Sequence, residues 1–453
     1  MTETTNSEAV FGSRMTRRTA LSRAGQMAAA TPALAMLLSA CGGGSGGGGG
    51  GTLNRALRLH HDAAVGPLFE PYVKHFNEAY SPLRLETSYV TQDYFGTTQT
   101  QLAGGSVDYD VLFADVGYLQ KWYDAGWIRS IEDMEGIDEI LGALPEGADA
   151  SLRAADGTLV SLPYYVGTDV FIYNADHLDQ IGAAPPATWE EMIEQCRELK
   201  SKGIAATPYS PFWTKDFSMM WYQLNDWAMA DGAADFFDDS LAPQFQDDPV
   251  VASTIERWKT LYDEGLVPKD ILTTDYGNTV NIFGGGKSTF THQYQLELLG
   301  FNNPENSKVA GSAKNALMPG STHTTLSSPA FWFMTATTPE PAKAWDLMSY
   351  LAATDKDGEY YVPQKLIATD LGLGTPYEAV NSDADVKASW GEWSDIDLLL
   401  EQMSNSKQVG PAVNQSWFPT FQETIAGLLQ EAVLGRKSIP DALKEAAAAA
   451  GSS

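Results

Sequence analysis

The chain of 453 residues predicts an α/β fold, because strand-like and helix-like segments alternate along most of its length. Short apolar runs such as "RALRLHHD", "PLRLETSYV" and "DYDVLFAD" have the composition of strands. Between the first two runs, apolar side chains recur along one helical stripe at Leu68, Phe69, Tyr72, Val73 and Phe76. This βαβ order favours a parallel or mixed sheet with helices on its faces.

A second block repeats the pattern. In "GTLVSLPYYVGTDVFIYNADHL", residues 170–173 have the apolar character of a strand core. The segment "PPATWEEMIEQCRELKSKGI" predicts a helix that opens with a capping box at Thr188 and Glu191 and ends at Gly203. We expect its buried stripe to contain Trp189, Met192, Ile193, Cys196 and Leu199. Cys196 is therefore predicted to be a core residue without a redox role.

The first 40 residues have the features of an export signal. Four arginines between residues 14 and 23 precede a weakly apolar stretch, residues 27–40, which is too short to span a bilayer comfortably. The Arg17–Arg18 pair resembles a twin-arginine signal. The tetrad "LSAC" resembles a bacterial lipobox, so we expect Cys41 to become the lipidated first residue of the mature protein. A disordered tail with a chance cysteine is the alternative.

Residues 42–51 are nearly all glycine and are interpreted as a flexible tether. A lipidated N-terminus needs such slack between the membrane and the folded domain. We therefore expect an exported protein that is lipid-anchored to the outer face of the cytoplasmic membrane, at the cell surface or in the periplasm. No later segment has the eighteen or so consecutive apolar residues of a membrane span, so the lipid is the only membrane contact we expect.

Charge and cysteine content exclude some classes of partner and of stabilisation. The formal net charge of −29 argues against nucleic acid as a partner, because binding to phosphates requires basic patches. The two cysteines are Cys41 and Cys196, so lipidation of the first leaves no internal disulfide. The folded domain must then be stabilised by its core alone.

Five segments, in order, resemble family 1 of the extracellular solute-binding proteins, the group that includes maltose-binding protein. The clearest joins "GTLVSLPYYVGTDVFIYNADHL" to "PPATWEEMIEQCRELKSKGI", with a Tyr-Asn pair and a Thr-Trp-Glu-Glu helix start. The others are "LAGGSVDYDVLFADVGYLQKWYDAGWI", "IFGGGKSTFTH", "TTPEPAKAWDLMSYLAA" and "VLGRKSIPDALKEAAAA". The likeness extends over nearly the whole mature chain, from residue 53 to residue 450.

The resemblance implies a two-lobed fold like that of the type II periplasmic binding proteins, with a ligand cleft between the lobes. We expect one lobe to take residues 52–163 and 327–375, and the other to take residues 164–326 and 376–450. Hinge closure would bury a ligand that contacts both lobes. The family role is that of a monomeric receptor, not an enzyme, which delivers its ligand to the permease subunits of an ABC importer with a cytoplasmic ATPase behind them. Neither a cofactor nor a catalytic residue is expected.

Aromatic residues outside obvious core positions indicate a carbohydrate ligand. The chain has 12 Trp and 19 Tyr, and several lie in loops or at strand ends. In "PYSPFWTKDF" the prolines exclude a regular helix, while aromatic rings surround a lysine and an aspartate. Sugars pack their C–H faces on such rings and direct their hydroxyls to polar partners. We expect Trp213 to stack on a sugar and Asp216 to accept a hydroxyl; packing of these rings against helices is the alternative.

Two carboxylates follow strands of the first lobe. The run "HHD" ends the first strand at Asp62, and "DVLFAD" ends another at Asp115. Both are candidate ligand contacts, because the carboxyl ends of strands meet at the edge where α/β folds bind ligands. Each could instead cap the helix that follows it. Tyr165 and Thr168 lie where the chain passes into the second lobe, a position near the ligand in the family.

Three further aromatic residues complete the expected site. Tyr294 lies in "THQYQ", at a strand end. Trp332 alternates with Phe331 and Phe333 in a strand, so the core takes one set of these rings. Trp417 stands just before a helix and is free to reach the cleft, because the buried stripe of that helix begins later, with Phe421, Ile425, Leu428 and Leu429.

Several strings that suggest catalysis or metal binding lack the context they need. The segment "GGGKST" lacks the first glycine of a phosphate-binding loop, where Asn281 stands instead. A G-x-S-x-G pattern at residues 43–47 lies inside the glycine tract rather than at a strand–helix turn. His60 and His61 have no second ligand pair nearby, so no metal site is expected. His292 and His323 are expected to be hydrogen-bonded structural residues.

Other functions stay open at this point. A surface glycoside hydrolase would also place two carboxylates across a carbohydrate cleft. The same fold could instead bind a polyamine, through converging carboxylates and aromatic walls. A polyol phosphate is a further possibility, but it needs arginines or helix N-termini, and the loop around Trp213 offers only Lys215.

Overall fold

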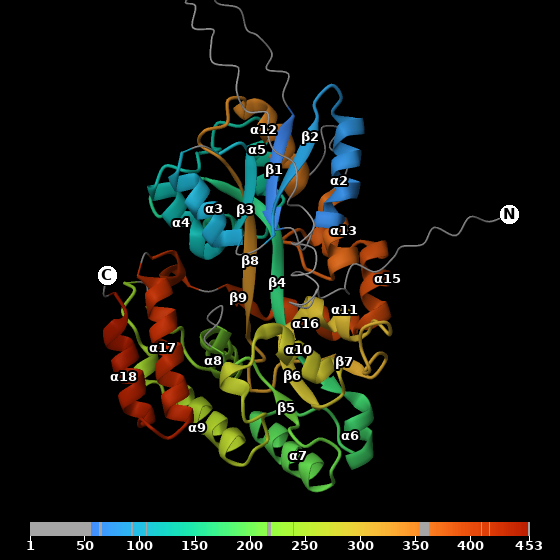
Figure 1. Cartoon of the computed structure of the whole chain (residues 1–453), viewed down its shortest axis with the longest axis vertical. Coiled ribbons are helices and arrows are strands. Elements are labelled where there is room, and N and C mark those ends of the chain that lie inside the picture. The colour runs from blue at the N-terminus through green and yellow to red at the C-terminus, as the bar shows by residue number, and fades with distance from the viewer. Residues whose placement is uncertain are drawn as a thin grey trace, which may run out of the picture. The chain divides into compact units, whose positions relative to one another are not determined.

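A mixed sheet runs through the part of the chain that the computed structural model describes, residues 56–451 except 63–65, 92–93, 106, 215–218, 239, 354–361, 409 and 416. The strand order is β2-β1-β3-β8-β4-β6-β5, with β7 beside β4 and β9 beside β8 (Figure 1). The strands are β1 Leu57–Asp62, β2 Leu85–Val90, β3 Val111–Asp115, β4 Ser161–Asn174, β5 Tyr209–Ser210, β6 Phe290–Tyr294, β7 Ala313–Ala316, β8 Thr325–Met334 and β9 Ser406–Gln408.

Helices precede and follow these strands, as the βα pattern of the sequence predicts. The first half of the chain contributes α2 Gly66–Ala79, α3 Tyr94–Ala103, α4 Val116–Asp124, α5 Ile137–Gly142, α6 Ala175–Ile181, α7 Trp189–Ser201 and α8 Met219–Ala230. The second half contributes α9 Pro249–Asp263, α10 Tyr276–Gly284, α11 Gln295–Phe301, α12 Pro341–Ala352, α13 Val362–Leu371, α14 Glu378–Asn381, α15 Ala384–Trp393, α16 Ile396–Ser404, α17 Phe418–Val433 and α18 Ile439–Ala449. None of the described helices has the length and hydropathy that crossing a bilayer requires.

Parallel and antiparallel pairs occur together in the sheet. β1 pairs in parallel with β2 and with β3, while β3 and β4 both pair antiparallel with β8. The prediction of a parallel or mixed sheet is therefore confirmed.

Helix α7 forms for the local reasons read from the sequence. The backbone N–H of Glu191 donates to Thr188 Oγ1 over 3.2 Å, and the N–H of Ala187 donates to the Glu191 carboxylate over 2.8 Å. These bonds satisfy amides that a helix N-terminus leaves without partners. Gly203 has a φ of 69° just after the helix, a conformation that favours glycine. The predicted apolar stripe is buried, including Cys196, whose thiol forms no disulfide.

The apolar side chains gather in two clusters. The first cluster lies around β1, β3, β8 and α12 and also takes in side chains of α14, α15 and α16. The second lies around α7, α8, α9, α17 and α18. Within it, α17 packs against α8, α9 and α18. Strand β4 contributes to both, because Val170 and Ile172 join the first cluster while Phe171 joins the second. This division follows the two faces of a strand, on which successive side chains alternate.

Strand β4 changes its partners halfway along its length. Residues from Ser161 to Thr168 pair with β8, and the two strands lie side by side (Figure 1). From Asp169 to Asn174 the strand pairs instead with β6 and β7. We call the point between Thr168 and Asp169 the changeover of β4. It brings the ends of β6 and β8 close to each other.

The capping box of α7 leads to a stability prediction. Replacing Thr188 by Ala should lower the free energy of unfolding by about 1 kcal/mol, because the N–H of Glu191 loses its acceptor. Urea unfolding followed by circular dichroism measures the change. The matched control is Thr420→Ala, at an exposed position on α17, which should change stability by less. Equal losses in the two variants would contradict the capping role.

Candidate functional site

Three neighbouring strands place Asp115 and Tyr165 on the same face of the sheet. Ala330 in β8 is the register partner of Asp115 in β3 and also of Tyr165 in β4. Directly opposed residues of antiparallel strands have their side chains on one face. The two side chains therefore stand two strand spacings apart, roughly 9–10 Å. The residue between them, Ala330, contributes only a methyl group to this row.

Asp115 occupies the N-cap position of α4 but makes no capping hydrogen bond with its side chain. The alternative of a capping role is therefore not realised. Burial raises the pKa of Asp115 from 3.8 to about 6. Burial raises the pKa of the Tyr165 hydroxyl, and the charge of the nearby Asp115 carboxylate raises it further. Both side chains remain partly exposed.

Tyr294 lies next to this pair, at the end of β6. It is the register partner of Asp169, and its hydroxyl is hydrogen-bonded to the side chain of Ser328 in β8. Its ring passes over Gly167, where a Cβ atom would stand 2.6 Å from Tyr294 Cε1. Only glycine leaves room for the ring at this position. Burial, the charge of Asp169 and the neighbouring Tyr165 all raise the pKa of the Tyr294 hydroxyl.

Tyr222 approaches from α8. Every other residue of that helix is buried, and Tyr222 alone in it is partly exposed. Its hydroxyl lies beside the Gln422 side chain of α17, and burial together with the charges of Asp115 and Asp169 raises its pKa to about 12. The Nε2 atom of Gln422 is buried and has no hydrogen-bond partner. Tyr222 thus lies within electrostatic reach of both carboxylates.

We call the group of Asp115, Tyr165, Tyr222 and Tyr294 the tyrosine–aspartate site. Its members come from β3, β4, α8 and β6. In the described part of the chain no lysine or arginine forms an ion pair with Asp115 or with Asp169. The site therefore offers ring faces, hydroxyl groups and carboxylate oxygens, without a fixed cation. Such a set is suited to a ligand that donates hydrogen bonds.

A buried polar cluster lies beneath the site. Asp169, Asp226 and His292 come from β4, α8 and β6, and one ligand atom of each lies within 4.8 Å of the other two. His292 is buried, as expected of a structural residue, and its Nε2 lies 3.1 Å from Asp226 Oδ2, although neither ring nitrogen makes a hydrogen bond of good geometry. For His323 the expectation is confirmed, since its Nδ1 lies 2.8 Å from the carbonyl oxygen of Met318.

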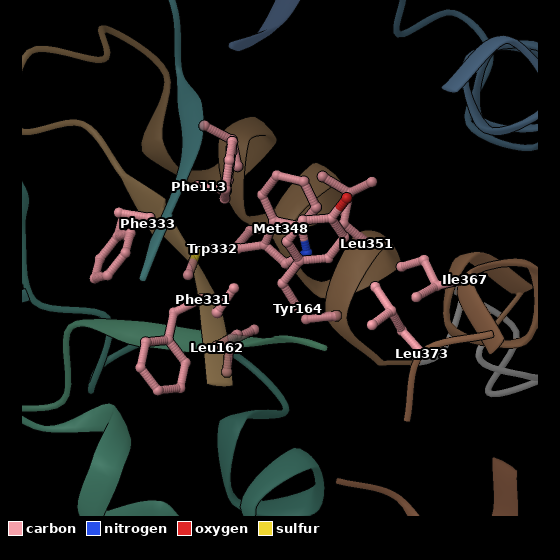
Figure 2. Close-up of a cluster of buried hydrophobic side chains, with 14 of the residues drawn as sticks. Phe113, Leu162, Tyr164, Phe331, Trp332, Phe333, Met348, Leu351, Ile367 and Leu373 are labelled. Atoms are coloured by element: carbon pink, nitrogen blue, oxygen red, sulfur yellow. The ribbon is translucent and has the colours of Figure 1, made fainter. Parts of the chain in front are cut away.

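Two expected tryptophans lie in the cores. The Trp213 side chain is fully buried in the second cluster, with its ring centroid 5.1 Å from that of Trp258. Trp332 is buried in the first cluster, where its ring lies 4.1 Å from that of Tyr164 (Figure 2). Core packing is the alternative that the sequence left open for both rings, and neither presents a face to the tyrosine–aspartate site.

The other expected residues have varied positions. Thr168 is fully buried at the changeover, and its hydroxyl has no hydrogen-bond partner. Trp417 is half-buried and packs on Phe421 at the start of α17. The side chain of Asp62, together with Asp216 and Cys41, lies outside the described residues. Of the expected site, the structure thus brings together Asp115, Tyr165 and Tyr294.

Sequence reasoning missed Tyr222, Gln422 and Asp169. Tyr222 stands in "SMMWYQLNDW", which reads as a uniformly apolar helix, and only the packing of α8 exposes that ring. Asp169 carried a usable signal, since a carboxylate inside the apolar strand "GTDVFIYN" requires a special partner. Gln422 had no such signal.

A hollow of about 370 Å³ lies around α10. Its lining is mostly polar and comes from the segment before α10, from α10 itself and from Lys287 after it, and none of the tyrosine–aspartate residues takes part. Its Asp275 is already engaged, because the carboxylate accepts the N–H of Asn278 and caps α10. Without an aromatic wall or an unsatisfied buried group, this hollow is the weaker candidate.

The chain is similar to bacterial solute-binding proteins in sequence. A family model described as bacterial extracellular solute-binding protein matches residues 71–391. The sn-glycerol-3-phosphate-binding periplasmic protein UgpB of Agrobacterium fabrum is 32% identical over 114 residues, 23% of this chain and 24% of that protein. The chain thus matches only about a quarter of the length of this curated relative.

Solved structures establish the fold. Maltose-bound MalE3 of T. maritima has a TM-score of 0.73 at 18% identity, over 87% of this chain and 98% of that chain. An ABC transporter solute-binding protein of Thermotoga lettingae, bound with α-D-tagatose, has a TM-score of 0.71 at 17% identity, over 87% and 98%. The expected two-lobed α/β fold of periplasmic sugar-binding proteins is confirmed.

The burial of Trp213 leads to a prediction about stability. Trp213→Ala should lower the free energy of unfolding by about 3–5 kcal/mol, because a large ring leaves a cavity in the second cluster. Chemical unfolding measures the loss. Trp417→Ala removes a half-buried ring from the same cluster and should cost clearly less. A Trp213 variant as stable as the parent protein would show that this ring is not part of the core.

The raised pKa of Asp115 predicts a pH-dependent difference between two proteins. Its pKa is higher in the folded state than its ordinary value of 3.8, so folding favours the protonated form. The stability that this proton contributes is full below about pH 4 and is lost as the pH rises through about 6. Asp115→Asn cannot ionise, so its stability relative to the parent protein should increase over that interval. Urea unfolding at several pH values measures this, and a constant difference would contradict it.

Proposed function

Because the chain belongs to the bacterial extracellular solute-binding proteins, we propose that it is the receptor of an ABC importer for a mono- or oligosaccharide. The observation that carries the proposal is the tyrosine–aspartate site, in which two partly exposed phenol rings, Tyr165 and Tyr222, lie near the Asp115 carboxylate and a third, Tyr294, lies near them. Sugar C–H faces pack on such rings, and sugar hydroxyls donate to such carboxylates. An affinity near micromolar, about −8 kcal/mol, is sufficient for capture and release.

The origin of the site residues supports capture by hinge closure. Asp115 and Tyr165 come from strands that hold the first apolar cluster, and Tyr222 comes from α8 in the second. A solute held by both groups favours the form in which they lie close together. We propose β4 and β8 as hinge strands between one lobe built around the first apolar cluster and another built around the second.

Export and anchorage are part of the same proposal. We propose that residues 1–40 are removed and that Cys41 carries the lipid, with residues 42–51 as the tether. These residues lie outside the described part of the chain, and the "LSAC" tetrad followed by glycines is their support. A receptor held near its permease subunits delivers its solute at a high local concentration.

A polyol phosphate is the second candidate, because UgpB relatives are named for binding sn-glycerol-3-phosphate. The charges of the site favour a neutral solute over this one. A phosphate group requires arginines, lysines or helix N-termini, whereas Asp115 and Asp169 would repel it. Ionised carboxylates that lack a cation are also compatible with a polyamine, which therefore enters the test as a third class.

A ligand panel tests the proposal directly. The purified protein is titrated with neutral sugars and polyols, with glycerol 3-phosphate and with spermidine, followed by tryptophan emission and isothermal calorimetry. We expect saturable binding of a neutral sugar or polyol and a raised melting temperature. Saturation by the phosphate or by spermidine alone would replace the solute class, and release of a shortened sugar would establish a hydrolase instead.

A pair of variants locates the binding in the molecule. Tyr222→Ala should weaken the sugar found in the panel by about 1–3 kcal/mol, because a stacking face and a hydroxyl are lost. The matched control is Tyr262→Ala in α9, whose hydroxyl donates to the Lys269 carbonyl away from the site. Calorimetry at one pH compares the dissociation constants. An unaltered constant for the Tyr222 variant would remove the tyrosine–aspartate site from the proposal.

A further inference from the structure

The cluster of Asp169, Asp226 and His292 is unusual in its burial and its lack of partners. The exposed fractions of the three residues are 6%, 0% and 1%. Each side chain comes from a different element, and yet their ligand atoms all lie within 4.8 Å of one another. The fold thus brings three polar groups to one buried point. Such an arrangement requires a partner that compensates for lost hydration.

Some atoms of the cluster are satisfied, and the unsatisfied ones face one another. Asp226 Oδ1 accepts the backbone N–H of Leu326 over 2.6 Å and the Thr325 hydroxyl over 2.9 Å. Asp226 Oδ2 has no hydrogen-bond partner, and neither nitrogen of His292 has one. His292 Nε2 and Asp226 Oδ2 lie only 3.1 Å apart. The unpartnered histidine is thus directed at the unpartnered carboxylate oxygen.

The charges of the cluster are not balanced by the protein. Within the described ranges, no lysine or arginine pairs with either carboxylate. Two ionised carboxylates and a neutral imidazole become a balanced set only when a divalent cation joins them.

We propose that Asp169, Asp226 and His292 are the ligands of a buried zinc ion. Zinc binds imidazole nitrogen and carboxylate oxygen together, whereas calcium and magnesium prefer oxygen ligands alone. Tetrahedral ligands at about 2.0–2.2 Å from zinc lie about 3.4 Å from each other, close to the spacing of His292 Nε2 and Asp226 Oδ2. A water molecule takes the fourth position.

The position of the cluster gives the ion a structural role. Asp169 is the first residue of β4 after its changeover from β8 to β6, and His292 stands in β6. Asp226 holds the first residues of β8 through its other oxygen. An ion on these ligands joins β4, β6 and α8 and, through Asp226, the start of β8. Zinc would therefore stiffen the changeover, whatever solute the tyrosine–aspartate site binds.

The test measures zinc on the purified protein after treatment with a chelator. Titration with zinc chloride against a chromophoric competitor should give one equivalent, and zinc should raise the melting temperature. Anomalous diffraction at the zinc edge should place the ion between His292 and the two carboxylates. Absence of saturable zinc binding would overturn the proposal, as would several weak equivalents or an ion found elsewhere.

Variants identify the ligands. His292→Gln and Asp226→Asn should each lower the affinity for zinc roughly a hundredfold or more, because a ligand is removed from the ion. His177→Gln is the matched control, since that half-buried histidine lies outside the cluster and contacts Thr289. Asp169→Asn provides a third ligand variant should another fail to fold, as judged by circular dichroism. Unchanged zinc affinity in a folded ligand variant, or an equal loss in the control, would contradict the assignment.

Discussion

The changeover of β4 is the constraint on which the other features depend. One strand pairs first with β8 and then with β6 and β7, and its alternating side chains pack into two different apolar clusters. Backbone groups must find partners on both sides of this point, so the ends of β6 and β8 are held close together. The ring of Tyr294 can lie over β4 only because residue 167 is glycine. The same junction thus sets the positions of the candidate site and of the buried cluster.

Two carboxylates near this junction, Asp115 and Asp169, have no lysine or arginine partner among the described residues. Asp115 and Asp169 are removed from water by the packing of strands and helices around them, and both have raised pKa values for that reason. An isolated domain gains nothing from burying such groups, because the desolvation is not offset. The desolvation free energy of these carboxylates is offset when an external molecule or ion supplies the missing partner. The proposed hydroxyl-rich solute at Asp115 and the proposed zinc ion at Asp169 would be two forms of this compensation.

Small residues matter at this site as much as the aromatic and acidic ones. Ala330 separates Asp115 from Tyr165 within one row of the sheet and places only a methyl group between them. Gly167 leaves room for the ring of Tyr294, because it has no Cβ atom. Trp213 and Trp332, which the sequence analysis expected in the ligand site, instead pack in the two cores. Burial of so much aromatic surface accounts for a stable domain whose described cysteine, Cys196, forms no disulfide.

Local elements and the fold class are predictable from the sequence, because their signals lie in neighbouring residues. The capping box and stripe of α7 and the strand ends at Asp115 and Tyr294 all follow from periodicity and caps. Which side chains meet depends instead on packing between distant segments. The exposure of Tyr222, the place of Trp213 in the core and the cluster around His292 depend on segments far apart in the chain. No local pattern encodes them, since they result from how β4, β6, α8 and α17 pack together.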